Sequence, residues 1–392
     1  MQKKKVLFVI HQLNYGGVQK SIIPALDAID YSKNEVTLYV RKNRIQLLPD
    51  VNPNVSKIIV NEDKTRYYRK PYMVYLQTLE VVSKLLKREK WEKDIHQKMV
   101  TYMNESQMKY EQKHYFNNDE EYDIAISYIS GFTAKFVVKY VQAKKKIMFY
   151  HLSVDDRHEL HECIMPSFDS IVGVSKNIEK LLKELYPVCI EKMTSMDNYV
   201  DEVQIRERAE KGKLENKDRE VILCSCGRLS PEKGFDLAVQ TAKILKERNI
   251  SFYWYFVGGG AERVKLEREI LENKLEDYIE ITGMQNNPYT YIGACDIYVQ
   301  PSYEESFGLT ITEAKILCKP IVSTKTVGAL GQMSHLEDGI LTNISAAEIA
   351  DGILKYIEDK ELKENVIENL KKIDYTVKFR EYQKQWEALL EG

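Results

Sequence analysis

Short runs of consecutive apolar residues alternate with segments of helical periodicity along the first half of the chain. Runs rich in Val, Ile and Phe that show no apolar–polar alternation are typical of strands covered on both faces, as in a parallel sheet. The runs that predict such strands are 6–10, 36–40, 58–60, 122–128, 146–151 and 170–174. Strands that alternate with helices indicate a doubly wound α/β architecture.

A second block of the same kind begins at residue 221, after a charged segment, 202–220, that we interpret as a linker with an exposed part. Its predicted strands are 221–227, 252–257, 278–282, 297–300 and 320–323. Its predicted helices begin near 235 and cover 262–272, 309–318, 346–358, 360–371 and 376–390. We therefore expect two Rossmann-like domains, residues 1–197 and 198–375, with a ligand-binding cleft between them.

Segment 64–115 interrupts this rhythm and is helical in pattern. Residues 64–93 contain nine basic and three acidic residues, a local excess of six positive charges, with tyrosines and leucines at helical spacing. Two interpretations stay open. The segment is either a surface helix whose apolar stripe packs on its domain, or a basic amphipathic face that rests on an anionic membrane surface.

Composition excludes several classes of protein. The 392 residues are 44% hydrophobic and carry a formal net charge of −2, which argues against a disordered chain and against a nucleic-acid partner. Six cysteines without a C-x-x-C pair favour a reduced, cytoplasmic setting. The apolar run 6–10 is too short for a signal peptide, and no apolar stretch reaches the length of a membrane span.

Three glycine-containing turns follow predicted strands, at 14–17, 227–234 and 258–260. Glycine at such a turn lets backbone N–H groups approach a phosphate closely, although glycine also occurs in turns for steric reasons alone. Turn 227–234, GRLSPEKG, adds two cations, Arg228 and Lys233. An Arg fork and a Lys point charge together suit a diphosphate, although taken in isolation the pair is equally consistent with solvated loop cations.

Two carboxylates lie eight positions apart in segment 301–314, PSYEESFGLTITEA. We expect Glu305 in the loop and Glu313 about one turn inside the next helix, so that both face one ligand. The amides near Gly308 and Leu309 then lie at a helix N-terminus, where they suit a phosphate. Carboxylates also accept hydrogen bonds from sugar hydroxyls, so the segment fits a nucleotide sugar.

Taken in order along the chain, these motifs resemble the retaining GT-B glycosyltransferases, and most closely glycosyltransferase family 4. The segments that carry the resemblance are GRLSPEKG, VGGG, ITGMQNNPYTYIGACDIYVQPSYEESFGLTITEAK and HLEDGI. The resemblance implies a GT-B fold, whose last helix, here 376–392, packs back on the N-terminal domain with Trp386 and Leu389 as packing residues. The chain departs from the family pattern at Cys318-Lys319-Pro320 and at Gly328-Ala329, which leaves the donor sugar open.

The resemblance also implies roles for single positions. The positions implied to act in catalysis are His151, Arg228, Lys233 and Glu305. The positions implied to bind the donor are Gly16, Gly17, Gly258, Gly283, Met284, Phe307, Gly308, Leu309 and Glu313. Within these sets, Arg228 and Lys233 hold the diphosphate, Glu305 contacts the sugar hydroxyls, and Glu313 contacts the ribose.

The implied function is transfer of a hexosyl-type sugar, with retention, from a nucleoside diphosphate sugar to a carbohydrate or lipid-linked acceptor in surface polysaccharide or glycoconjugate assembly. A UDP-sugar is favoured over a GDP-sugar, and no cofactor or metal is expected; His158, His161 and Glu162 have ligand types without the H-E-x-x-H form. The alternatives are a catalytically silent GT-B subunit that stabilises a partner, or a sugar-nucleotide epimerase. We expect a cytoplasmic protein, with peripheral attachment to the inner face of the cell membrane through 64–93.

Overall fold

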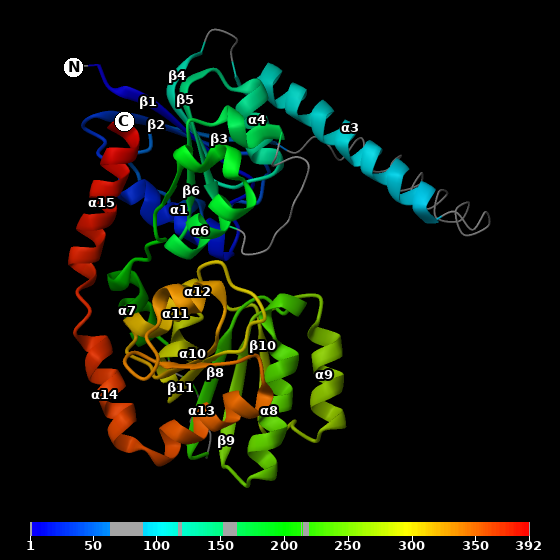
Figure 1. Ribbon diagram of the computed structural model, residues 1–392, viewed down its shortest axis with the longest axis vertical. Coiled ribbons are helices and arrows are strands. Elements are labelled where there is room, and N and C mark those ends of the chain that lie inside the picture. Colours follow the sequence, from blue (N-terminus) through cyan, green and yellow to red (C-terminus); the bar gives the residue numbers. More distant parts are fainter. Residues whose placement is uncertain are drawn as a thin grey trace.

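Two parallel β-sheets, each in its own half of the chain, define the architecture (Figure 1). The computed structural model describes residues 2–62, 89–116, 120–151, 163–212, 214 and 219–391, and for residues 89–100 it describes the backbone alone. Within these ranges the N-terminal sheet has seven strands and the C-terminal sheet has six. The α/β fold class with two parallel sheets is therefore confirmed.

The N-terminal sheet has the strand order β3-β2-β1-β4-β5-β6-β7. Its strands are β1 (Lys4–Ile10), β2 (Asn34–Val40), β3 (Lys57–Val60), β4 (Tyr122–Ser127), β5 (Ala143–Tyr150), β6 (Ser170–Gly173) and β7 (Met193–Ser195). The helices between them are α1 (Gly17–Asp27), α3 (Glu89–Tyr115), α4 (Phe132–Tyr140) and α6 (Lys176–Leu185), with 3₁₀ turns η1 (Leu48–Asp50), η2 (Met165–Ser167) and η3 (Pro187–Lys192). Strand β1, which lies between β2 and β4, is buried along 6–10, as its unbroken apolar run predicts.

The C-terminal sheet has the strand order β10-β9-β8-β11-β12-β13. Its strands are β8 (Val221–Cys226), β9 (Phe252–Val257), β10 (Ile279–Gly283), β11 (Ile297–Gln300), β12 (Ile321–Thr324) and β13 (Ile340–Thr342). The helices of this half are α7 (Glu202–Glu210), η4 (Pro231–Lys233), α8 (Phe235–Glu247), α9 (Arg263–Glu272), α10 (Tyr289–Ala294), α11 (Leu309–Ile316), α12 (Val327–Gln332), α13 (Ala346–Glu358) and α14 (Lys360–Lys371), and the chain ends with α15 (Tyr375–Glu391).

One element contradicts the expected linker at 202–220. Helix α7 occupies its first nine residues, with Ile205 buried. The Asp201 side chain caps the helix by accepting a hydrogen bond of 3.1 Å from the Gln204 amide, and Glu202 pairs with Arg206 at 2.8 Å. A single buried apolar side chain among charged neighbours leaves almost no periodic signal, which is why the sequence pattern failed here. The short strands β7 and β13 and helices α10 and α12 were not predicted either.

The chain passes between the two halves twice. The first passage joins β7 to α7, and the second joins α14 to α15, which runs along one side of the molecule toward the N-terminal sheet (Figure 1). The two passages touch each other, because the Tyr199 hydroxyl donates to the Tyr375 carbonyl at 3.4 Å and the Tyr199 ring lies 5.0 Å from the Phe379 ring.

Helix α15 packs on the N-terminal sheet. The Trp386 ring is fully buried, with its centroid 5.6 Å from that of Phe8 and 5.2 Å from that of Phe149. The ammonium groups of Lys4 and Lys145 donate to the last carbonyls of the helix, those of Leu390 and Leu389, at 2.8 and 2.9 Å. Those carbonyls lack partners within the helix, so the lysines satisfy its C-terminus.

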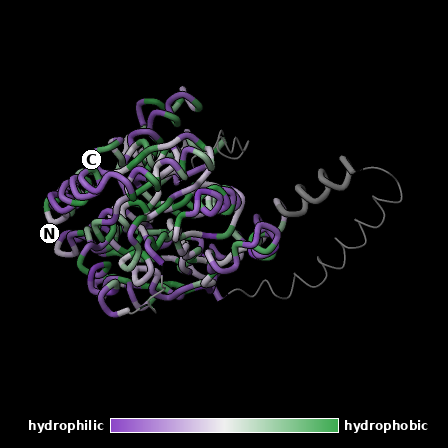
Figure 2. The backbone as a smooth tube through the Cα atoms, turned by 90° about the horizontal axis from the view of Figure 1, so that it is seen from below, coloured by the Kyte–Doolittle hydropathy of each residue, from purple (hydrophilic) through white to green (hydrophobic). Residues whose placement is uncertain are grey.

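Apolar stretches are enclosed within the body, and hydrophilic stretches run along its outer helices (Figure 2). One buried cluster belongs to the C-terminal sheet alone, whereas the other joins the N-terminal sheet, α15 and the face of the C-terminal half around α10 and α11. The two halves therefore share packed surface. In the part of the chain that the structure describes, no helix combines the length and apolar character that crossing a membrane requires.

Candidate active site

Three glycine turns meet at the carboxyl edge of the C-terminal sheet. Gly258 has a φ of +154° and forms an isolated bridge with Gly283, whose φ is +74°. A Cβ on Gly258 would lie 1.8 Å from the Gly227 carbonyl oxygen, so side chains are excluded where the turns after β8 and β9 touch. Two of the predicted donor-binding positions, Gly258 after β9 and Gly283 at the end of β10, are thus neighbours, and both lie beside the turn that follows β8. Met284, the next residue, is exposed.

The turn after β8 presents the two predicted cations. Arg228 is exposed, and η4 carries Lys233. Gly234 follows in the left-handed conformation with a φ of +66°, and a Cβ there would lie 2.0 Å from the Pro301 carbonyl oxygen. This close contact holds the turn after β8 against the loop after β11. The pKa of Glu232 is lowered, because hydrogen bonds, including that of Ser230, and the charges of Lys233 and Arg228 outweigh the effect of burial. Both cations therefore lie near the Glu232 carboxylate.

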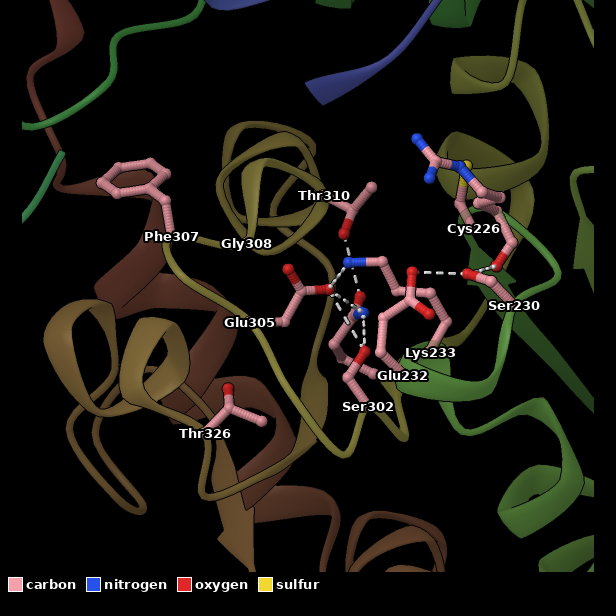
Figure 3. Close-up of polar contacts among 12 residues, drawn as sticks. Cys226, Ser230, Glu232, Lys233, Ser302, Glu305, Phe307, Gly308, Thr310 and Thr326 are labelled. Carbon is pink, nitrogen blue, oxygen red and sulfur yellow. Dashed lines mark hydrogen bonds and ion pairs between the residues drawn. The ribbon is translucent and has the colours of Figure 1, made fainter. Parts of the chain in front are cut away.

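Lys233 and Glu305 form the centre of a polar network (Figure 3). The Lys233 ammonium lies 2.7 Å from Glu305 Oε1. The same oxygen accepts hydrogen bonds from Gln300 Nε2 at 3.0 Å and from the Ser302 hydroxyl at 3.2 Å. Thr310, in the first turn of α11, donates to Gln300 Oε1 at 2.8 Å. The end of β11, the following loop and α11 therefore fix the Glu305 carboxylate.

The loop after β11 leads into the N-terminus of α11, as predicted. Gly308 is left-handed, with a φ of +83°, and precedes the helix, while the Gln332 amide of α12 donates to the Phe307 carbonyl. A Cβ on Gly328 would lie 2.5 Å from the Phe307 carbonyl oxygen, so α12 supports the loop by direct backbone contact. Helix α12 therefore supports the loop. Among the described residues, no side chain caps the first amides of α11.

Glu313 lies on α11 and is 1% exposed. Its Oε1 atom accepts from the Lys20 ammonium at 3.0 Å and from the Tyr289 hydroxyl at 3.3 Å. Lys20 belongs to α1 of the N-terminal domain, so this ion pair spans the two domains. Gly17 opens α1, and a Cβ on it would lie 3.8 Å from Leu309. The predicted glycine turn of the N-terminal domain thus borders the start of α11.

Lys20, Tyr289, Gln300 and Ser302 escaped the sequence reasoning. Lys20 stands three residues after Gly17, which places it in the first turn of the helix behind a suspected phosphate turn, and that spacing was an available signal. Its pairing with Glu313 joins residues 293 positions apart, and only the packing of the domains brings them together.

His151 follows β5 and is 5% exposed. Its ring lies 5.3 Å from Tyr128 and 6.4 Å from Phe149, both of the N-terminal domain, and Nε2 is buried with no hydrogen-bond partner among the described residues. Burial lowers the pKa of His151 to about 3, outweighing the opposing hydrogen bond with the Tyr128 backbone. His151 is therefore a neutral base, and its described contacts do not extend to the network around Glu305.

Among the residues with described positions, no group of three or more His, Cys, Asp or Glu side chains could hold a metal ion. His158, His161 and Glu162, which the sequence singled out as residues of ligand type, lie outside the described residues, as does most of the basic segment 64–93.

Comparison with known proteins supports the fold described above. Residues 206–373, less than half of the chain, match the family described as glycosyl transferases group 1. The structure is similar over 99% of the chain to all of Anabaena Alr3699/HepE, solved in complex with UDP and glucose, with a TM-score of 0.68 and 16% sequence identity. The chain has the GT-B fold of such structures.

Two curated relatives illustrate the sequence similarity. Alpha-D-kanosaminyltransferase of Streptomyces kanamyceticus is 27% identical over 179 residues, 44% of this chain and 46% of that protein. The lipopolysaccharide core biosynthesis glycosyltransferase LpsE of Rhizobium meliloti is 26% identical over 160 residues, 41% of this chain and 46% of that protein. The similarity thus spans less than half the length of each relative.

Proposed function

We propose that the protein is a retaining glycosyltransferase of family 4, which transfers a hexosyl-type sugar from a nucleoside diphosphate sugar, with UDP-sugars favoured. The single observation that carries the proposal is the convergence of Lys233 and Glu305 at 2.7 Å, beside the N-terminus of α11. The match of residues 206–373 to glycosyl transferases group 1 supports it.

The proposed mechanism assigns the leaving diphosphate to Arg228, Lys233 and the first amides of α11. Negative charge on the diphosphate grows as the bond to the sugar C1 breaks, so fixed cations and amides stabilise the transition state more than the bound donor. The acceptor hydroxyl attacks C1 on the face that the diphosphate leaves, and its proton passes to a donor phosphate oxygen. One C–O bond breaks, one forms, and the configuration at C1 is retained.

Glu305 serves in this proposal as a hydroxyl acceptor and not as a nucleophile. Its Oε1 atom is already engaged by Lys233, Gln300 and Ser302. A carboxylate oxygen that carries an ammonium ion and two further donors is a weak nucleophile, because its charge is neutralised where it would attack. Among the described residues Oε2 has no hydrogen-bond partner, so it is the oxygen that we assign to a hydroxyl of the donor sugar.

The acceptor proposed is a carbohydrate or a lipid-linked saccharide in surface polysaccharide or glycoconjugate assembly. The name of LpsE, a lipopolysaccharide core glycosyltransferase, supports this choice. We also propose peripheral attachment to the inner face of an anionic membrane through residues 64–93, which carry the net excess of six positive charges described above.

Donor consumption tests the activity. We expect turnover of a UDP-sugar in a donor panel with a mixed saccharide acceptor pool, and a fall in kcat of about 10²- to 10³-fold in Lys233→Ala and Glu305→Ala, because each removes a fixed partner of the transition state. Glu304→Ala is the matched control, since Glu304 is the exposed neighbour of Glu305 and should leave turnover unchanged.

Four outcomes would contradict the proposal, or one part of it, in different ways. Wild-type turnover in both variants would remove Lys233 and Glu305 from the site. A new sugar nucleotide formed without acceptor would indicate an epimerase. Absence of binding to UDP, GDP and ADP in a thermal-shift screen would favour a silent subunit. Inverted configuration at C1 of the product would refute retention alone.

A further inference from the structure

The ion pair between the domains is asymmetric at the carboxylate. Lys20 and Tyr289 both donate to Oε1 of Glu313, at 3.0 and 3.3 Å, and the Lys20 ammonium also lies 3.4 Å from the Tyr289 hydroxyl. The same ammonium stands 5.1 Å from the centroid of the Tyr289 ring. Three groups from α1, α10 and α11 therefore form one compact cluster.

The second oxygen of Glu313 is left over. Oε2 is buried, as is the whole side chain at 1% exposure, and it has no hydrogen-bond partner among the described residues. A buried carboxylate oxygen without a donor is costly, so such an atom points to a missing partner. A ligand hydroxyl that reaches Oε2 would supply the absent hydrogen bond.

Lys20 places a positive charge 3.0 Å from the Glu313 carboxylate. Burial opposes the charged form of Lys20, but the Glu313 carboxylate, together with Tyr289, outweighs burial and raises the pKa of the lysine, so Lys20 is a cation in this cluster. The Lys20 side chain is 26% exposed, while the carboxylate is almost fully covered. The cation is thus the member that reaches the cluster from the opposite domain.

We propose that Lys20, with Tyr289, is a positioning residue for donor recognition: it holds Glu313 by one oxygen so that the other oxygen faces the ribose hydroxyls of the nucleotide. The proposal rests on the proposed function, which assigns the ribose to Glu313. Because Lys20 belongs to the N-terminal domain, ribose recognition then requires the two domains to be closed on each other. Nucleotide binding and domain closure are coupled through one side chain.

A competing interpretation predicts the opposite effect of Lys20 on nucleotide affinity. If Lys20 occupied the place of the ribose, the nucleotide would have to displace it, and removing the lysine would tighten binding. The geometry favours positioning, because both donors share Oε1 and leave Oε2 available.

Calorimetric titration with UDP and 2′-deoxy-UDP separates these interpretations. We expect wild type to prefer UDP about tenfold, because the deoxy nucleotide lacks a hydroxyl for Glu313. Lys20→Met should weaken UDP binding about tenfold and reduce the preference toward one, whereas Lys20→Arg should restore much of both. Tyr289→Phe should show a smaller effect of the same kind. In turnover, KM should rise with kcat nearly unchanged, because the ribose is remote from the reacting bond.

Matched controls are Lys144→Met, at an exposed lysine of the N-terminal domain, and Tyr291→Phe, two positions along α10. Both should retain the wild-type preference. An unchanged preference in Lys20→Met, an equal loss of affinity for both nucleotides, or tighter UDP binding would each overturn the positioning role. If wild type binds neither UDP nor GDP, the proposed function itself fails, so the two failures are distinguishable.

A measurement without ligand distinguishes loss of the Lys20–Glu313 interaction from a general folding defect. In thermal unfolding, a double-mutant cycle of Lys20→Met and Glu313→Gln should show coupling, so that the double variant loses no more Tm than Glu313→Gln alone. Additive losses in Tm would mean that the two side chains do not interact, and would refute the bond on which the role depends.

Discussion

His151 is enclosed by aromatic side chains of its own domain, which makes it a residue whose protonation opposes folding. Burial lowers its pKa to about 3, from an ordinary value near 6.5. Between these two pKa values the unfolded chain binds a proton that the folded chain does not. The free energy of unfolding therefore falls as the pH drops below about 6.5, and this loss continues until the pH reaches the folded-state pKa.

We expect His151→Asn to reduce the acid sensitivity of the protein. Lowering the pH from 6.5 to 5 should reduce the free energy of unfolding of wild type by about 2 kcal/mol through this one residue, and the variant should lack that contribution. Chemical denaturation at both pH values measures it, with His114→Asn, an exposed histidine of α3, as control. The idea fails if wild type and His151→Asn lose equal stability over this pH interval.

At the level of elements, α3 is held to the N-terminal sheet by a buried ion pair. Arg41, just beyond β2, contacts both oxygens of Glu111, with Nε to Oε2 at 2.8 Å and Nη2 to Oε1 at 3.2 Å. The guanidinium also donates to the Phe132 carbonyl at 3.0 Å, and Glu111 is fully buried. Removing one partner would leave the other charge buried and unpaired.

Glu111→Ala should therefore lower the free energy of unfolding by about 3 kcal/mol or more. Glu105→Ala, on the same helix, removes the more exposed partner of Lys135 and Lys139 and should cost less than about 1 kcal/mol. Urea denaturation compares the two variants. Equal effects would mean that burial of the Arg41–Glu111 pair does not set its contribution.

Elements could be predicted where a local pattern decides them. The unbroken apolar run 6–10 indicated a buried strand, and Gly308 correctly marked the start of α11, because both signals lie within a few residues. Helix α7 and strand β13 could not be found in this way, since one buried Ile205 or three residues at the sheet edge leave no periodicity. Their existence depends on tertiary packing.

The residues of the site likewise fall into those that a sequence pattern predicts and those that only tertiary packing brings together. Lys233 and Glu305 were assigned from a family pattern, and the structure brings them within 2.7 Å. The Lys20–Glu313 and Arg41–Glu111 pairs join distant segments of the chain. Glu313 was assigned from the family pattern, but Lys20, Arg41 and Glu111 each look in the sequence like ordinary surface charges. No local rule distinguishes a lysine that solvent surrounds from one that faces another domain.

For the molecule as a whole, the proposed membrane attachment makes a prediction about salt. The protein should co-sediment with phosphatidylserine vesicles at about 50 mM salt and dissociate toward about 500 mM, where the screening length falls well below 10 Å. Phosphatidylcholine vesicles should not bind it. Replacing Lys64, Arg66, Arg69 and Lys70 with Ala should weaken the association with phosphatidylserine. Absence of binding to anionic vesicles at low salt would refute the attachment.

The contact between the two interdomain passages limits how the halves of the molecule can move. A single flexible connection would let one half twist and slide freely over the other, but here two stretches of backbone cross side by side and are bonded through Tyr199 and Tyr375. Two adjacent anchor points define an axis, so hinge rotation about that axis is the relative motion of the two halves that these connections restrict least. If the two halves rotate about this axis, their facing surfaces keep their register, so that Lys20 meets the same Glu313 carboxylate in every closed state.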